Sequence, residues 1–218
     1  DLHVPTFGRD HHAQPIGSPA QIGQQPGHGL GGRHREGPQE SAAGRIALAG
    51  FTNSRDFPIT QNAFQPLLGG ADAINAFLTI LDLRAAPSKA VTYSTYYGGR
   101  GTEIAWDLKR DARGKFYVGG YSFSENLPVS QNALNPVPAK TGLNGFIAVI
   151  DPSAPPLNAL SYASYITGPG SQVVYGVDVD ANGSIYLTGY ATSDIFPAGF
   201  QTHNTPGNSD SFVLVFKP

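Results

Sequence analysis

Ile46-Ala-Leu-Ala-Gly50, Phe116-Tyr-Val-Gly-Gly120 and Ile185-Tyr-Leu-Thr-Gly189 are three versions of one short segment. The step from Gly50 to Gly120 is 70 residues, and the step from Gly120 to Gly189 is 69. A fixed long period indicates one supersecondary unit that is copied and stacked, because a single copy cannot bury its own apolar faces. This repeat decides the fold class.

The middle copy contains a complete unit of four strands. Ile104–Leu108 alternates apolar and variable residues, as a half-buried strand does, and Asp111–Gly114 is a turn sequence that leads into a second strand at Lys115–Tyr121. The apolar run Phe146–Ile150 predicts a third strand buried on both faces. Leu160–Tyr165 alternates small residues with tyrosine and predicts an outer strand that has one face on a neighbour.

The other two copies are partial. The first, residues 41–99, has no sequence that matches the opening strand, and the third, residues 169–218, ends before its fourth strand. With the complete copy at 100–168, this predicts ten strands at most, in an incomplete ring of about 2.5 to 3 four-stranded antiparallel blades. The fold class is therefore all-β and propeller-like.

Three sets of residues carry a resemblance to a known family: Tyr93-Ser-Thr-Tyr-Tyr-Gly-Gly99, the motif from Asp111 to Tyr121, and Asp194-Ile-Phe-Pro197. Together they resemble the bacterial SBBP-type β-propeller repeat, over about residues 41–218. The resemblance implies seven-bladed propellers in secreted or surface-associated proteins, mostly without an assigned activity. Because only one unit is complete here, we expect further blades or other chains to complete the ring.

Residues 1–40 differ from the rest of the chain. They are dense in Gly, Pro and Gln and show no strand or helix period, so we expect this segment to be disordered. Five of the six histidines lie in it: His3, His11, His12, His28 and His34. Their spacing defines no coordination geometry, so we predict no metal site, although binding of a transition metal is the alternative.

Composition excludes several functional classes. The net charge of −2 argues against a nucleic-acid partner, and no run of about eighteen apolar residues could span a membrane. The absence of cysteine excludes disulfides and thiolate sites. Gly98–Gly101 follows a strand but precedes another strand rather than a helix, so it is not a phosphate loop, and no cofactor is predicted.

Asp178-Val-Asp-Ala-Asn-Gly183 has the form of a calcium loop. However, Asp178 is aligned with Lys109 of the middle copy, and the acidic residue that should close such a loop is missing. Asp180 and Gly183 are explained by a hairpin turn, which is the preferred interpretation.

Aromatic and polar residues at equivalent places in the repeat are interpreted as structural. Trp106 corresponds to Tyr175, and packing between blades is preferred there over a platform for sugars. We expect a packing role also for Tyr93, Tyr96, Tyr162 and Tyr165. We expect a local backbone hydrogen bond at the start of the third strand for Asn75, Asn144 and Asp210.

The predicted function is a non-enzymatic scaffold or binding module outside the cell, with protein or glycan contacts through loops at one rim: 53–75, 122–144 and 191–210. No catalytic residue is predicted, since no nucleophile motif is present and His203 is the only histidine of the repeat region. The alternative is a carbohydrate-active hydrolase or lyase. It requires that carboxylates converge in one pocket, and the candidates are Glu103, Asp107, Asp178 and Asp194.

Overall fold

The computed structural model describes residues 39–41, 44–192 and 209–218. Residues 1–38, with their histidines, and Asp194 and His203 lie outside the described residues. The described part forms eleven β-strands and two short 3-10 helices, so the predicted all-β class is confirmed. Neither of these two helices has the length or the hydropathy needed to cross a bilayer.

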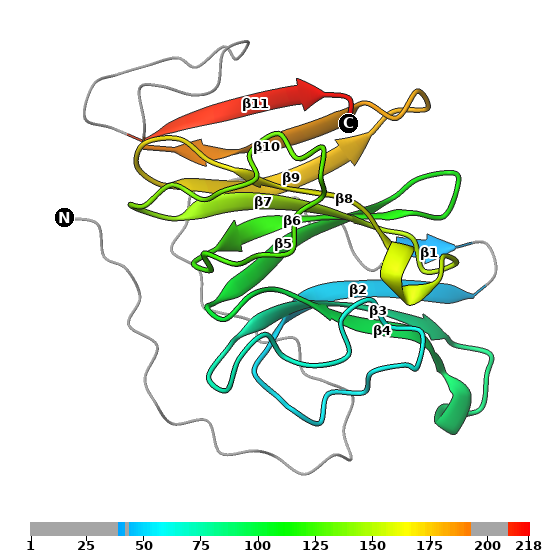
Figure 1. The fold of residues 1–218 in the computed structure, drawn as a ribbon. Coiled ribbons are helices and arrows are strands. Elements are labelled where there is room, and N and C mark those ends of the chain that lie inside the picture. Colours follow the sequence, from blue (N-terminus) through cyan, green and yellow to red (C-terminus); the bar gives the residue numbers. More distant parts are fainter. Residues whose placement is uncertain (1–38, 42–43, 193–208) are drawn as a thin grey trace. The chain divides into compact units, whose positions relative to one another are not determined.

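The strands form three antiparallel sheets in chain order (Figure 1). The first sheet contains β1 (Gln39–Ser41), β2 (Arg45–Thr52), β3 (Asn75–Asp82) and β4 (Val91–Tyr97). The middle sheet contains β5 (Glu103–Arg110), β6 (Phe116–Ser122), β7 (Asn144–Ile150) and β8 (Leu160–Ile166). The last sheet contains β9 (Gln172–Val179), β10 (Ile185–Ala191) and β11 (Asp210–Phe216). The 3-10 helices η1 (Pro87–Lys89) and η2 (Pro156–Asn158) precede β4 and β8.

In the middle copy, a turn held by the side chain of Asp111 closes the hairpin between β5 and β6. Asp111 Oδ1 accepts the N–H groups of Arg113 at 2.9 Å and Lys115 at 2.8 Å. Gly114 has a φ of 91°, a conformation that glycine adopts without strain. This turn makes β5 and β6 adjacent, as the sequence predicts.

Each opening strand packs against the sheet before it. β5 lies against β1, β2 and β3, and β9 lies against all four strands of the middle sheet. Two apolar clusters result, one between the first and middle sheets and one between the middle and last sheets. The middle sheet is therefore covered on both faces (Figure 1).

The prediction that third strands are buried on both faces is confirmed for β7 and wrong for β11. All seven residues of β7 are buried. In β11, Phe212 and Leu214 are buried, but Val213 and Val215 are 57% and 52% exposed. The reason is that, among the described residues, the last sheet has a neighbour on one face only.

The first copy has a shortened opening strand, whereas the sequence predicts none. β1 pairs with β2, with Gln39 opposite Ala47 and Glu40 opposite Ile46. Adding 70 to each number gives Lys109 opposite Tyr117 and Arg110 opposite Phe116, which are pairs of the middle sheet. β1 thus occupies the place of the last residues of an opening strand, although its residues show no strand pattern.

The fourth strands are more buried than an outer strand should be. Ser164 and Tyr165 in β8 are 0% and 1% exposed. The loop between β6 and β7 runs back along β8, where Ser130 donates its N–H to Ala163 O at 3.0 Å. Thr60 and Ser94 form the equivalent bond of 3.1 Å in the first sheet. Much of the predicted rim loops 53–75 and 122–144 therefore serves to cover β4 and β8.

Candidate functional site

The linker between the first and middle sheets, residues 98–103, is organised by the buried carboxylate of Glu103. We call it the first junction. Glu103 is 0% exposed, and its Oε2 accepts the Gly99 N–H at 2.9 Å and the Asn75 amide at 2.8 Å. Ser122 Oγ donates to Oε1 at 2.7 Å. One side chain thus connects β3 of the first sheet, the linker and β6 of the middle sheet.

Burial raises the pKa of Glu103 above its ordinary value of 4.5. The hydrogen bonds from Ser122, Gly99 and Asn75 act in the opposite direction, because each favours the ionised carboxylate. A buried acid with a raised pKa is a feature of many catalytic sites, but it also occurs in structural networks. The residues around Glu103 therefore decide whether it is a catalytic acid or part of a structural network.

The residues that bond to Glu103 also bond to the backbone around it, as in a structural network. Asn75 also donates to Gly99 O at 2.9 Å and accepts the Gly69 N–H at 2.7 Å. A Cβ at Gly98 would meet the Glu103 carboxylate and the Asn75 amide, so only glycine fits there. The predicted local bond of Asn75 is confirmed, whereas its second role across the junction is not predicted from the sequence.

The glycine-rich segment Gly98–Gly101 has no free backbone donors of the kind that bind phosphate. Arg100 N–H bonds Asn126 Oδ1 at 2.9 Å, and Gly101 N–H bonds Ser124 Oγ at 2.7 Å. With Gly99 N–H on Glu103, three successive amides bind side chains of the protein itself. The segment is a linker between sheets.

The linker between the middle and last sheets, residues 167–172, is the second junction, and Gln172 occupies the place of Glu103. Gln172 is 0% exposed, and its Oε1 accepts the Gly168 N–H at 3.0 Å. Its Nε2 donates to Pro169 O at 3.0 Å. Asn144 accepts the Ala139 N–H at 2.8 Å, which confirms its predicted local bond. Asp210 is the first residue of β11.

The carboxylates proposed for a hydrolase have separate partners. Asp107 accepts the Leu108 N–H with Oδ1 at 2.8 Å and the Val177 N–H with Oδ2 at 2.6 Å. Asp178 forms an ion pair of 3.1 Å with Lys109, the residue with which it is aligned in the repeat. The bond to Val177 and this ion pair both join β5 to β9, whereas Glu103 belongs to the first junction, so each of the three acids is engaged with its own partners in the fold.

A pocket of about 270 Å³ opens in the loop between β2 and β3. Its lining consists of Arg55, Leu67, Leu68, Gly70 and Ala71. None of these residues is an acid, a histidine or a hydroxyl nucleophile. The pocket therefore offers no pair of groups for acid–base or nucleophilic chemistry.

The sequence with the form of a calcium loop is a hairpin turn. Asp180 Oδ1 accepts the N–H groups of Asn182 at 2.9 Å and Ser184 at 2.8 Å, and Gly183 has a φ of 84°. The Ser184 N–H lowers the pKa of Asp180. Among the described residues, no group of three His, Cys, Asp or Glu side chains could hold a metal ion.

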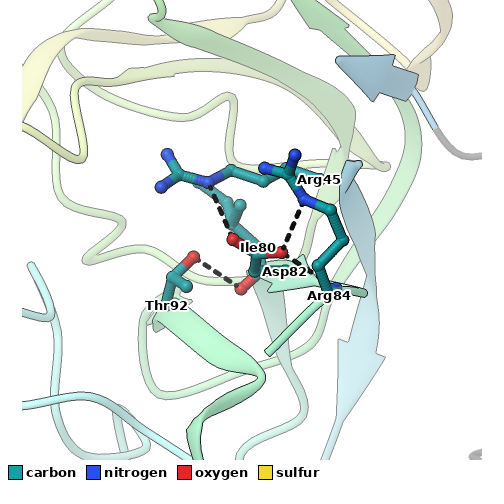
Figure 2. Close-up of polar contacts among 5 residues, drawn as sticks. All are labelled: Arg45, Ile80, Asp82, Arg84 and Thr92. Carbon is teal, nitrogen blue, oxygen red and sulfur yellow. Dashed lines mark hydrogen bonds and ion pairs between the residues drawn. The ribbon is translucent and has the colours of Figure 1, made fainter. Parts of the chain in front are cut away.

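A polar cluster at the end of β3 stabilises the turn that follows. Figure 2 shows Arg45 and Arg84 beside Asp82, each with its Nε 3.7 Å from a carboxylate oxygen, and Thr92 donating to Ile80 O at 3.1 Å. The Arg84 N–H is the main cause that lowers the pKa of Asp82, with both guanidinium groups adding to it. Both arginine side chains are more than half exposed, which makes this a solvated surface cluster.

Trp106 and Tyr175 contact each other across the middle and last sheets, as the packing interpretation predicts. Their ring centroids are 5.8 Å apart in an edge-to-face arrangement. The predicted burial role of the other tyrosines is also observed, since Tyr93, Tyr96, Tyr162 and Tyr165 are at most 3% exposed. Trp106 and Tyr175 differ from them, because they are 54% and 51% exposed.

Comparison with known proteins supports the repeat. The family model described as SBBP, beta-propeller repeat, matches residues 162–197. The matched stretch includes most of β8, the second junction, β9 and β10. No curated protein matches the chain. The resemblance that the sequence suggests is thereby confirmed as a repeat of this type.

Proposed function

We propose that Glu36–Pro218, a compact unit, is a non-enzymatic scaffold module of a β-propeller, extended by further sheets of the same repeat. The support comes from the face of the last sheet that no other described element covers. In the middle sheet, Tyr117, Ile147 and Val149 are at most 6% exposed, because β9 and its sheet cover them. Their equivalents are found by adding 69 or 66: Tyr186, Val213 and Val215.

These equivalent residues are exposed by 38%, 57% and 52%. Contiguous exposed apolar residues on a sheet indicate a surface that another element covers. We call Tyr186, Thr188, Val213 and Val215 the docking face. Its partner is a sheet whose opening strand takes the position that β9 has on the middle sheet, from the same chain or another copy.

The docking face differs from its buried counterpart at two positions: Val213 replaces Ile147, and Thr188 replaces Gly119. The second difference defines the partner. A Cβ at Gly119 would lie 2.8 Å from Val174 Cγ1 and closer still to Val177, so glycine allows β9 to approach. Thr188 holds this position in the last sheet. An incoming strand therefore requires a residue smaller than valine opposite Thr188.

Sedimentation velocity on the full chain tests the scaffold function. We expect association that grows with protein concentration, since a face complementary to sheets of the same repeat forms head-to-tail contacts. Val213→Lys with Val215→Lys should abolish it, whereas the control Leu157→Lys, at a residue 96% exposed on η2, should not. A chain that stays monomeric at about 100 µM, a concentration at which even a weak interface is occupied, contradicts the proposal.

An assay of polysaccharide cleavage tests the non-enzymatic part. Cleavage that disappears in Asp107→Asn and Asp178→Asn would favour the hydrolase instead. We place the module outside the cell, because the SBBP-type repeat implies secreted or surface proteins. Detection of the native protein only in the cytoplasm would contradict this location.

A further inference from the structure

Trp106, Tyr175 and Tyr190 form a row of rings that we call the aromatic row. Trp106 lies 5.8 Å from Tyr175, and Tyr175 lies 5.8 Å from Tyr190, measured between ring centroids. The row begins on β5 and continues over β9 and β10, so it crosses from the middle sheet to the last sheet.

Two β-bulges place the first two rings. In β5, Ala105 pairs with Gly120 and Asp107 with Gly119, so Trp106 has no partner in the ladder. Tyr175 is skipped in the same way between Val174 and Gly176 of β9. A bulge redirects the side chain of the extra residue, and bulges are frequent at sheet edges and next to active sites.

The exposure of Trp106 does not result from an uncovered sheet face. Trp106 belongs to the middle sheet, which is covered on both faces, and yet 54% of it is exposed. This separates the aromatic row from the docking face, whose exposure depends on an uncovered sheet. A large ring that stays exposed inside a packed stack has a surface available for a ligand.

A short hydrogen bond holds the two ring-bearing strands together. Asp107 follows Trp106, and its Oδ2 accepts the N–H of Val177, two residues after Tyr175, at 2.6 Å. The bond connects β5 to β9 directly, beside the rings of Trp106 and Tyr175. A rigid arrangement reduces the entropy that a ligand loses on binding.

The chemistry of the row suits a neutral ligand with apolar faces and hydroxyl edges. The three side chains carry no charge, and burial raises the pKa of Tyr175 and of Tyr190, which keeps both phenols protonated. Within the described residues neither phenol oxygen has a hydrogen-bond partner. The charges of Lys109 and Asp178 offset each other in an ion pair.

We propose that the aromatic row binds a neutral oligosaccharide, with sugar rings stacked on Trp106 and Tyr175 and sugar hydroxyls bonded to the phenols of Tyr175 and Tyr190. The proposal deepens the proposed function and rests on it, because it assigns a ligand class to a scaffold that does not cleave its ligand. A sugar pyranose has C–H groups on its faces and hydroxyls at its edge, which matches this combination of rings and donors.

The fluorescence of Trp106 is a direct probe, because it is the only tryptophan of the chain. We would titrate the full chain with three neutral hexasaccharides: cellohexaose, maltohexaose and chitohexaose. The expected result is a saturable spectral change with at least one of them, with a Kd between about 10 µM and 1 mM.

Variants test the role of each ring. Tyr175→Ala should weaken binding more than about tenfold, which corresponds to the loss of one stacking contact. Tyr190→Phe retains the ring and should weaken binding less than Tyr190→Ala. Phe51→Ala is the matched control, because Phe51 holds the place of Tyr190 in the first sheet and is 49% exposed. It should leave the Kd unchanged.

Three results would overturn the proposal: no spectral change with any of the three sugars, a change that persists in Tyr175→Ala, or a change produced only by a proline-rich peptide. None of them affects the association of the chain through the docking face. Failure of the oligosaccharide site is therefore distinguishable from failure of the scaffold function.

Discussion

The two junctions share one backbone frame. Glu103 donates its N–H to Ile74 O at 2.7 Å, and Gln172 donates to Leu143 O at 2.8 Å. In each, the side chain accepts the N–H of a glycine four residues earlier, at 2.9 Å for Gly99 and 3.0 Å for Gly168. The path from sheet to sheet is therefore repeated with the strands.

The side chains at the two junctions perform different tasks. Glu103 bonds to the first sheet through Asn75 and to the middle sheet through Ser122. The side chain of Gln172 bonds to Gly168 and Pro169 of its own linker, and the residue equivalent to Ser122 is Ala191, which has no hydroxyl. A buried carboxylate occurs where donors from two sheets converge, and a neutral amide occurs where they do not.

The largest expected effect comes from removal of the polar group at each junction. Glu103→Leu leaves the Gly99 N–H, the Asn75 amide and the Ser122 hydroxyl without their buried acceptor. We expect a loss of about 3 to 5 kcal/mol in the free energy of unfolding, and about 1 to 3 kcal/mol for Gln172→Leu. Urea denaturation measures both. Equal losses would show that the carboxylate does not connect the sheets more strongly than the amide does.

Away from the linkers, the contact between the middle and last sheets depends on close packing of apolar groups. Gly119→Thr introduces into the middle sheet the residue that the last sheet has, and its Cβ would meet Val174 and Val177. We expect a loss of about 1 to 3 kcal/mol in the free energy of unfolding, as for other overpacked cores. Thermal and urea unfolding provide the measurement.

The reverse substitution, Thr188→Gly, is the matched control, because Thr188 is exposed on the docking face. We expect it to cost less than about 1 kcal/mol, mainly from the greater freedom of glycine in the unfolded chain. A cost for Thr188→Gly as large as that for Gly119→Thr would mean that the two faces are packed alike.

The period of the repeat predicted the strands well. The apolar segments at Ile46, Phe116 and Ile185 became β2, β6 and β10, and the aspartate turns formed where predicted. This succeeded because strand alternation and turn chemistry are local properties. β1 was missed, since Gln39–Ser41 owes its pairing to the exposed edge of β2 and not to its own pattern.

The role of Glu103 at the first junction and the exposed face of β11 were harder to predict from the sequence. From sequence, Glu103 is a candidate only for a catalytic acid, because its three donors come from positions 75, 99 and 122 and meet only after the sheets stack. The exposure of β11 depends on which faces are covered, which one strand cannot reveal. The recurrence of Gly99 and Glu103 as Gly168 and Gln172 was the available signal for the junction.

A smaller effect concerns pH. Because burial raises the pKa of Glu103, the folded chain holds this proton more tightly than the unfolded chain does. The stability from this group is thus fully present below its ordinary pKa of 4.5 and is lost as pH rises through the folded pKa. Glu103→Gln, which copies the second junction, should remove this dependence.

Unfolding free energies of wild type and Glu103→Gln, measured between about pH 4 and 8, give a difference curve in which the other carboxylates cancel. The wild type should lose stability relative to the variant as pH rises. A flat difference curve, or one of opposite sign, would show that the donors around Glu103 fully compensate for its burial. The first junction would then resemble the second energetically.

The smallest effect is expected from calcium, because the hairpin turns of the middle and last sheets are alike. Asp111 and Asp180 each accept two backbone N–H groups with Oδ1, so both hairpins close without a cation. Calcium at about 5 mM should shift the Tm by less than about 1 °C, since a ligand stabilises a protein only by binding the folded state. Asp178→Asn is the control, because Asp178 would be the first ligand of a calcium loop. A rise in Tm that Asp178→Asn abolishes would show that the last sheet has a cation site that the middle sheet lacks.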